Sequence, residues 1–337
     1  MTLTRLLVVL LALATLGCSS VVAPPPPVDV SWMRQERLFD AFDPRATDTF
    51  SPLNAYLLAL AAKAGDAGTA DQQSTLAVWG FDRYTPFVDR NASVYAYVAS
   101  SPSMVLVVFS GTDIRNLRDL QSDIDALAPI RNERYGGAPG ALVHRGFAAG
   151  LDSIWHALTR EVIDHQKPAA AGGTPKPLWV AGHSRGGAFA ALAAAGRTQD
   201  DSDGDDAAPP HVTGLYTFGQ PRVGNLALAR ALAGSGVAYY RIVNDQDAVA
   251  AVPVGAGRLA PEYAHAGTLA HLADADGPRL RFNPPDATQR LWVVDPDHYL
   301  DVYLRNLHAV LRDPSRIEDD RVRAATTRPA MALPVPR

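Results

Sequence analysis

The pentapeptide Gly182-His183-Ser184-Arg185-Gly186 constrains this 337-residue chain more than any other feature. It directly follows the apolar run 177–181 and directly precedes the alanine-rich stretch 187–196. This order predicts a buried strand, a sharp turn and a helix, with a serine at the tip of the turn. Glycines are expected on both sides because the turn brings two backbone segments so close that a Cβ would clash. Such a turn lifts the hydroxyl clear of its neighbours and aims it at a cleft.

Strand-like and helix-like segments alternate along the rest of the chain. Further strands are predicted at residues 76–81, 94–98, 104–109, 215–218, 237–243 and 291–294. Further helices are predicted at residues 51–61, 147–165, 226–232 and 299–311. This alternation indicates a mostly parallel sheet with helices on both faces. Together with the serine turn it predicts the α/β-hydrolase fold, in which ligands bind at the carboxyl ends of the strands.

The N-terminal segment reads as an export signal. Arg5, the apolar run 6–16 and the small residues around Cys18 describe a secretory signal, and the run is shorter than the ~20 residues that span a bilayer. Cys18 is the only cysteine, so no internal disulfide can form. Its position resembles the lipobox of bacterial lipoproteins, although Thr15 stands where leucine is usual. The resemblance implies lipid attachment at Cys18 and an outer-membrane lipoprotein, with a periplasmic or secreted product as the alternative.

These features divide the chain into four parts. We expect a signal peptide at 1–17, a lipid anchor and Pro-rich linker at 18–35, the α/β-hydrolase domain at 36–314, and a mobile C-terminal tail at 315–337. With 47% hydrophobic residues, the chain can bury a large core. The net charge of −4 and the lack of a Lys/Arg run argue against a nucleic-acid partner.

A serine hydroxyl is a weak nucleophile unless a base takes its proton, and the base needs an acid to orient it. In α/β-hydrolases the acid and then the histidine follow the serine along the chain. The predicted strand 237–243 leads into Asp245 and Asp247, and either aspartate qualifies as the acid. For the base, His298 is favoured because it follows the last predicted strand. Three rivals remain, which are His265, His271 and His308.

The oxyanion of the reaction needs two N–H donors. The backbone of Arg185, directly after the serine, is expected to supply one. The other is expected from the loop 110–113, which follows the predicted strand 104–109.

Taken together, the ordered motifs resemble those of class 3 (fungal-type) lipases. The matching segments extend from about residue 51 to residue 308 and include 107–112, 143–147, 180–187, 216–225 and 241–253. The family's acid precedes a short segment that ends in proline, which implies Asp247 rather than Asp245. Its histidine precedes an aromatic residue and a terminal helix, which supports His298. Its side-chain oxyanion donor corresponds to Thr112.

The resemblance implies hydrolysis of carboxylic esters of acyl lipids through an acyl-enzyme on Ser184, with no cofactor and no metal. Phospholipase A1, another carboxylesterase or an acyltransferase is the alternative on the same triad. A non-catalytic surface lipoprotein on a hydrolase scaffold is a further alternative. The sequence does not indicate an oligomeric state.

Three segments depart from the family pattern or stay open. Arg185 stands where the family usually has leucine, and it places a cation near the expected cleft. Residues 114–128 have apolar side chains at helical spacing, which fits either a lid or a helix packed on the core. The acidic segment 200–206 resembles a Ca²⁺ loop, but its glycine is out of register, so a solvated loop is favoured.

Overall fold

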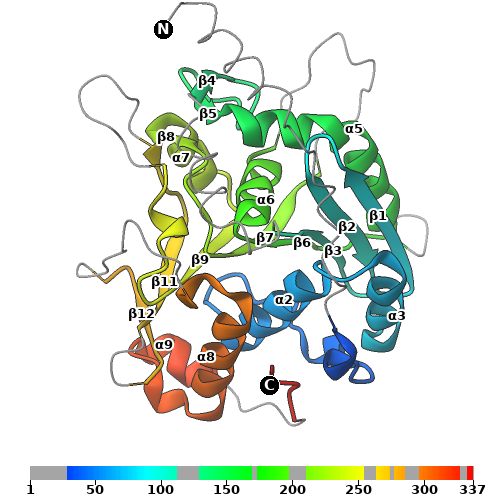
Figure 1. Ribbon diagram of the computed structural model, residues 1–337, viewed down its shortest axis with the longest axis vertical. Helices are drawn as coiled ribbons and strands as arrows, with labels where there is room; N and C mark the ends of the chain where they lie inside the picture. Colours follow the sequence, from blue (N-terminus) through cyan, green and yellow to red (C-terminus); the bar gives the residue numbers. More distant parts are fainter. Residues whose placement is uncertain are drawn as a thin grey trace, which may run out of the picture.

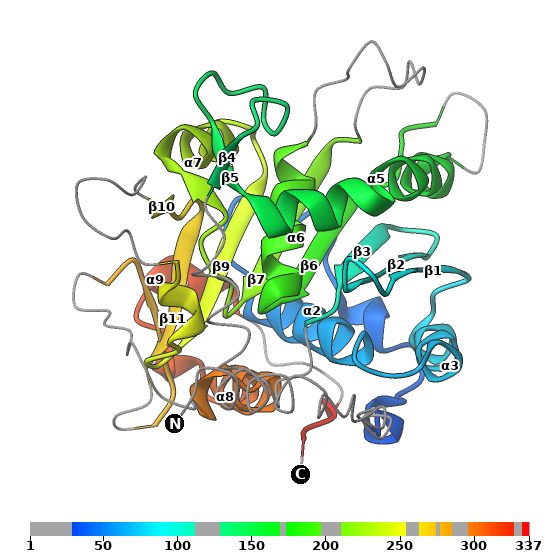
Figure 2. The same cartoon turned by 45° about the horizontal axis from the view of Figure 1, so that its top comes forward.

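The computed structural model describes residues 29–111, 129–168, 173–196, 210–253, 263–273, 277–284, 296–326 and 332–336. Several sequence predictions lie outside these residues. They concern Cys18, Thr112, the stretch 114–128, the acidic segment 200–206 and the expected strand 291–294. Figure 1 and Figure 2 show the described part as a central sheet between two layers of helices.

The described residues form a central sheet of eight strands in the order β1-β2-β3-β6-β7-β9-β11-β12. The strands are β1 (Arg83–Asp89), β2 (Val94–Ser100), β3 (Val105–Phe109), β6 (Leu178–His183), β7 (Val212–Phe218), β9 (Ala238–Asn244), β11 (Thr268–Ala273) and β12 (Arg279–Phe282). The run from β3 to β11 pairs in parallel, whereas β1, β2 and β12 pair antiparallel at the edges. The predicted, mostly parallel sheet is therefore confirmed.

Helices cover both faces of this sheet (Figure 2). One face packs against α2 (Pro52–Ala64) and α8 (Leu300–Arg312), and the other packs against α5 (Arg145–Gln166), α6 (Arg185–Ala195) and α7 (Leu226–Ala233). Side chains of a strand alternate between the two faces. Leu106 and Val108 accordingly lie in the core on the α2 and α8 side, whereas Val105 and Val107 lie in the core on the α5, α6 and α7 side. Because both faces are buried, the strands are almost continuously apolar.

Local capping explains where two helices begin. Ser51 caps α2, and its hydroxyl accepts a hydrogen bond from the N–H of Asn54 at 3.1 Å. Pro52 occupies the first turn, where its missing N–H costs nothing. Asn225 caps α7 in the same way. A small second sheet of β4 (Pro129–Arg131), β5 (Leu142–His144), β8 (Gly224–Asn225) and β10 (Tyr263–Ala264) lies beside α7.

The strand predicted at 76–81 is wrong, because most of this segment belongs to helix α3 (Thr69–Trp79). Its buried residues Gln72, Thr75, Leu76 and Trp79 recur at helical spacing, which places them on one face of a helix. Gly80 then ends the helix with a φ of 104°, a conformation that glycine adopts at little cost. The apolar run at the end of α3 is too short for its period to separate helix from strand.

Three strands of the central sheet were not predicted. The edge strand β1 contains Pro86 and is partly exposed, so it lacks the apolar run of a central strand. Strand β11 carries His271, and β12 is rich in arginine. Their pairing with neighbouring strands, rather than their own composition, makes them strands.

Both ends of the described domain pack more closely than the sequence predicts. Val30 and Met33, in the expected linker, lie in the core, and the indole N–H of Trp79 donates to the carbonyl of Met33 at 2.8 Å. In the expected mobile tail, Ile317 is fully buried and pairs with β12, and Val322 is buried on helix α9 (Asp320–Ala325). A few isolated apolar residues therefore hold each end, without the periodicity that a sequence reading detects.

Within the described ranges, no helix is both long and apolar enough to cross a bilayer.

Candidate active site

Ser184 lies at the turn between β6 and α6, as predicted. Its backbone has φ 56° and ψ −129°, a strained conformation for a residue other than glycine. A Cβ on Gly182 would lie 2.3 Å from the carbonyl oxygen of Gly186, and a Cβ on Gly186 would lie 2.2 Å from that of Phe109. Both glycines are therefore required by close backbone packing. The N–H of Ser184 donates to the carbonyl of Phe218 at 2.8 Å, which fixes the turn on β7.

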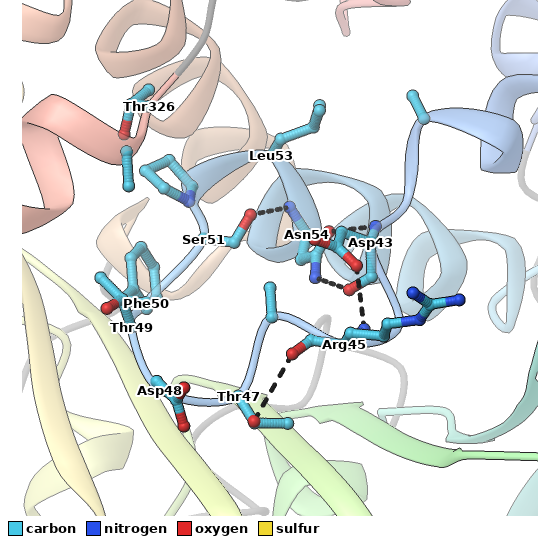
Figure 3. Close-up of a pocket in the computed structure, with 14 residues that line it drawn as sticks. Asp43, Arg45, Thr47, Asp48, Thr49, Phe50, Ser51, Leu53, Asn54 and Thr326 are labelled. Atoms are coloured by element: carbon cyan, nitrogen blue, oxygen red, sulfur yellow. Dashed lines mark hydrogen bonds between the residues drawn. The ribbon is translucent and has the colours of Figure 1, made fainter.

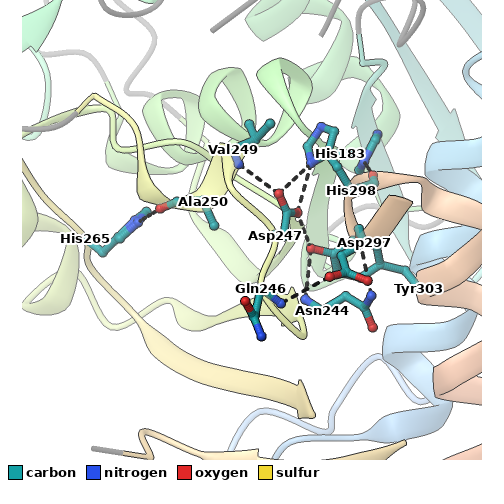
Figure 4. A network of polar contacts seen from close by, with 10 residues as sticks. All are labelled: His183, Asn244, Gln246, Asp247, Val249, Ala250, His265, Asp297, His298 and Tyr303. Atoms are coloured by element: carbon teal, nitrogen blue, oxygen red, sulfur yellow. Dashed lines mark hydrogen bonds and ion pairs between the residues drawn. The ribbon is translucent and has the colours of Figure 1, made fainter. Parts of the chain in front are cut away.

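His298 and Asp247 meet although they lie far apart in the sequence (Figure 4). Nδ1 of His298 lies 2.9 Å from each carboxylate oxygen of Asp247. His298 comes from the turn Pro296–His298 that precedes α8, and Asp247 comes from the loop after β9. Both side chains are fully buried. A buried charge requires partners of this kind.

Two further donors hold the carboxylate of Asp247. The hydroxyl of Tyr303, on α8, donates to Oδ2 at 2.6 Å, and the N–H of Val249 donates to Oδ1 at 2.9 Å. Burial by itself raises the pKa of Asp247, but the charge of His298 and the hydrogen bonds from His298 and Tyr303 outweigh it. The pKa of Asp247 therefore lies below its ordinary value, and the carboxylate stays ionised.

Two side-chain atoms of the site lack a hydrogen-bond partner within the described part of the chain. They are Oγ of Ser184 and Nε2 of His298, and both are buried. Buried polar atoms are usually paired. The hydrogen bond between a catalytic serine and its histidine is often long or poorly aligned before a substrate binds, so these two atoms remain candidates for proton transfer.

Gly219 packs directly against the Asp247–His298 pair. It follows β7 with a φ of 55°. A Cβ at this position would lie 2.4 Å from Oδ2 of Asp247 and 2.8 Å from Nδ1 of His298. Only glycine combines this backbone conformation with the absence of a side chain.

The other candidate acid and bases lie elsewhere. Asp245 is half-exposed, and its backbone carbonyl accepts from Nε2 of His271 at 2.7 Å. Nε2 of His265 lies 2.8 Å from the carbonyl oxygen of Ala250. His308 lies on α8 beside the ring of Tyr56. The structure brings none of the three rival histidines to the carboxylate of Asp247.

On the oxyanion side, the described chain reaches Gly111. A Cβ there would lie 3.7 Å from Cβ of Ser184, so the end of β3 packs against the serine. Thr112 follows directly but lies outside the described residues. Arg185 opens α6, where backbone N–H groups lack partners within the helix. Its guanidinium donates to the carbonyl of Ser93 and lies 5.8 Å from the ring centre of Phe189.

The sequence reading missed three residues that support the site. They are Tyr303, which binds Asp247, and the pair Asn244 and Asn306. Nδ2 of Asn244 donates to the carbonyl of Asp297 at 3.2 Å, and its Oδ1 accepts from Asn306 at 2.6 Å. Tyr303 and Asn306 lie on the buried face of α8, so helical spacing after His298 was the available signal.

A separate pocket lies beside the N-terminus of α2 (Figure 3). It has a volume of about 340 Å³ and is lined mainly by the loop 43–51 and by Thr326. Ser184, Asp247 and His298 do not line it. The charged residues that line it, Asp43, Arg45 and Asp48, are all exposed. No group of three or more metal-binding side chains occurs in the ranges that the structure describes.

The sheet, the serine turn and the buried Asp–His pair define a protein with the α/β-hydrolase fold. The native Rhizomucor miehei lipase propeptide complex aligns with a TM-score of 0.51 at 26% identity, over 69% of this chain and 72% of that one. A fungal lipase–inhibitor complex aligns with a TM-score of 0.54 at 25% identity, over 73% and 92%. More narrowly, residues 106–256 match the family described as lipase (class 3).

Sequence relatives agree with this match. The Rhizomucor miehei lipase is 31% identical over 172 residues, which are 51% of this chain and 43% of the relative. Toxin TseL of Vibrio cholerae serotype O1 is 30% identical over 190 residues, or 54% and 26%. Secreted mono- and diacylglycerol lipase 1 of Fusarium solani is 29% identical over 187 residues, or 52% and 49%. The alignments span less than half the length of each of these relatives. They support the resemblance to class 3 lipases.

Proposed function

We propose that this protein hydrolyses carboxylic esters of acyl lipids through an acyl-enzyme on Ser184. The observation that carries the proposal is the fully buried Asp247–His298 pair on the same sheet edge as the strained serine turn. His298 removes the proton from Ser184 through Nε2 as Oγ attacks the ester carbonyl. Asp247 holds the opposite nitrogen and stabilises the imidazolium that forms.

The N–H groups of Arg185 and Thr112 bind the oxyanion of the tetrahedral intermediate. Each donor of such a pair contributes about 3 kcal/mol to the transition state. His298 then protonates the leaving alcohol, and water reverses the steps on the acyl-enzyme. In this step Arg185 acts through its backbone N–H, and its guanidinium donates to the carbonyl of Ser93 and lies near the ring of Phe189. This chemistry requires neither a metal nor a cofactor.

A labelled fluorophosphonate tests the nucleophile. We expect it to modify the wild type and Ser103→Ala, an exposed control, but not Ser184→Ala. Equal labelling of Ser184→Ala and the wild type rejects Ser184. Folded wild type that neither reacts with the probe nor cleaves esters supports the non-catalytic alternative.

Acylglycerols are the substrate class that we propose, because one relative above is named as a lipase and another as a mono- and diacylglycerol lipase. A chloroplastic phospholipase A(1) of Arabidopsis thaliana is also 31% identical over 156 residues, which keeps phospholipids as the alternative. A panel of esters that varies acyl length and head group separates these. A strong preference for glycerophospholipids rejects the acylglycerol assignment.

We infer that the protein is exported and anchored in the outer membrane through Cys18. The apolar segment 6–16, the small residues around Cys18 and the four prolines at 24–27 support this inference. An alkyne palmitate fed to producing cells is expected to label the wild type but not Cys18→Ser. Equal labelling of both proteins contradicts the anchor.

A further inference from the structure

His183 is buried directly before the nucleophile, yet the mechanism above gives it no role. It is the last residue of β6 and is 3% exposed. Its Nε2 lies 2.8 Å from the backbone carbonyl oxygen of His298 (Figure 4). A carbonyl oxygen only accepts, so Nε2 of His183 carries the hydrogen. The ring therefore donates to the backbone of the proposed base.

The ring of His183 also contacts both sides of the site. It lies 4.7 Å from the ring of His298 at an interplanar angle of 31°. It meets the ring of Tyr303, which binds Asp247, edge-on at 6.2 Å. On its other side, a Cβ on Gly111 would lie 3.2 Å from Nδ1. His183 thus fills the space between the Asp–His pair and the strand that leads to the oxyanion loop.

The turn that carries His298 is held by donors from two strand ends. The carbonyl of Asp297 accepts from Asn244, at the end of β9, and the carbonyl of His298 accepts from His183, at the end of β6. Strand β6 also leads directly into Ser184. The hydrogen bond from His183 therefore ties the base to the same strand that positions the nucleophile. Sites held by rigid strands keep their geometry best.

The electrostatic surroundings keep His183 neutral. Burial, and next the charge of His298, lower the pKa of His183 to about 3. Three smaller effects follow: the hydrogen bond to the carbonyl of His298 and the charge of Asp247 raise this pKa, and the charge of Lys63 lowers it. At neutral pH, His183 therefore remains a hydrogen-bond donor at Nε2 and does not compete with His298 for the serine proton.

We propose that His183 is a positioning residue, a neutral Nε2–H imidazole that holds the backbone of His298 in line with Ser184. The proposal rests on the function proposed above. It predicts that loss of the donor lowers kcat more than it changes KM, because His183 is buried and shapes the base rather than the substrate pocket. A misplacement of the base by about 1 Å is enough to slow the reaction about 100-fold.

Two variants of similar length separate the donor from the packing. In His183→Gln, the amide N–H can reach the same carbonyl. In His183→Met, the volume remains but no donor does. We expect kcat for a soluble ester to fall about 10- to 100-fold in His183→Met, and to stay within about 3-fold of the wild type in His183→Gln. Fluorophosphonate titration counts the competent molecules, so kcat is corrected for any unfolded protein.

His165→Met is the matched control. His165 is equally buried, but it binds Glu161 on α5, away from the site. We expect it to change thermal stability without changing kcat. Equal kcat in His183→Met and the wild type overturns the positioning role, and so does a loss in His183→Gln as large as that in His183→Met.

Nitrogen NMR of ¹⁵N-histidine-labelled wild type supplies a test that needs no variant. At neutral pH, we expect the His183 signal of a neutral ring protonated at Nε2. A ring protonated at Nδ1, or an imidazolium, overturns the proposal. Failure of the proposed function looks different, because the wild type itself is then inactive toward esters and unreactive toward the probe.

Discussion

At the scale of single residues, the site depends on glycines, whose missing side chains leave space for the reacting groups. Gly219 contributes no side chain, and this absence leaves room for the carboxylate of Asp247 and the imidazole of His298. Gly182 and Gly186 do the same for the serine turn. The reacting groups can approach one another only because these positions lack a Cβ.

We therefore expect Gly219→Ala to lower kcat by about 100-fold or more, because the new methyl displaces the Asp–His pair. Gly236→Ala is the matched control. Gly236 also has a positive φ, of 79°, but a Cβ there has nothing within 4 Å. Backbone strain of about 1–2 kcal/mol is common to both variants. Ester hydrolysis and thermal unfolding of the two variants separate strain from the clash, and equal kcat values contradict the clash.

At the scale of elements, the C-terminal segment after α8 belongs to the domain. Ile317 is fully buried and pairs with Leu280 of β12, and α9 begins with a cap in which Asp319 accepts from the N–H of Val322 at 2.9 Å. This segment closes the edge of the core beside α8 and β12. A few buried contacts thus replace the apolar repeat that would have predicted it.

Replacing Ile317 by alanine is expected to lower the free energy of unfolding by about 2–4 kcal/mol, since it removes a buried aliphatic side chain. Urea denaturation measures the change. Glu318→Ala, a neighbour whose side chain is 51% exposed, is expected to shift it by less than about 0.5 kcal/mol. If Ile317→Ala also changes the free energy of unfolding by less than about 0.5 kcal/mol, the C-terminal segment does not stabilise the fold.

At the scale of the whole molecule, buried neutral histidines link stability to pH. Burial is the largest cause that lowers the pKa values of His183 and His265 below 6.5, to about 3 for His183. A group with a lowered pKa in the folded state contributes stability that is complete above its unfolded pKa and is lost as pH falls. The carboxylate of Asp247, whose pKa is also lowered, acts in the same direction at lower pH.

We therefore expect the free energy of unfolding to decrease as the pH is lowered from 6.5 to 4. Each such histidine contributes about 1.4 kcal/mol per pH unit in this window. Urea denaturation at several pH values measures how steeply the free energy of unfolding changes with pH. His183→Gln is expected to reduce this slope by up to about 1.4 kcal/mol per pH unit, which corresponds to one proton. An unchanged slope in that variant shows that His183 already takes up its proton in the folded protein.

Some features follow from the sequence alone because they are local. The pentapeptide around Ser184 predicts its turn, since steric crowding between glycine positions acts over a few residues. Apolar runs predict β3, β6, β7 and β9, since strands buried on both faces are mostly apolar. Short runs fail where the period is ambiguous, as at residues 76–81.

Only the tertiary structure decides which distant groups meet. From the residues alone, Asp245 and Asp247 were equal candidates, and the resemblance to class 3 lipases favoured Asp247. The loop after β9 directs Asp247 toward His298 and leaves Asp245 half-exposed. The roles of Tyr303 and His183 depend in the same way on packing between α8 and the strand ends. Local sequence sets each backbone segment, whereas the order of strands in the sheet sets the distances between side chains far apart in the chain.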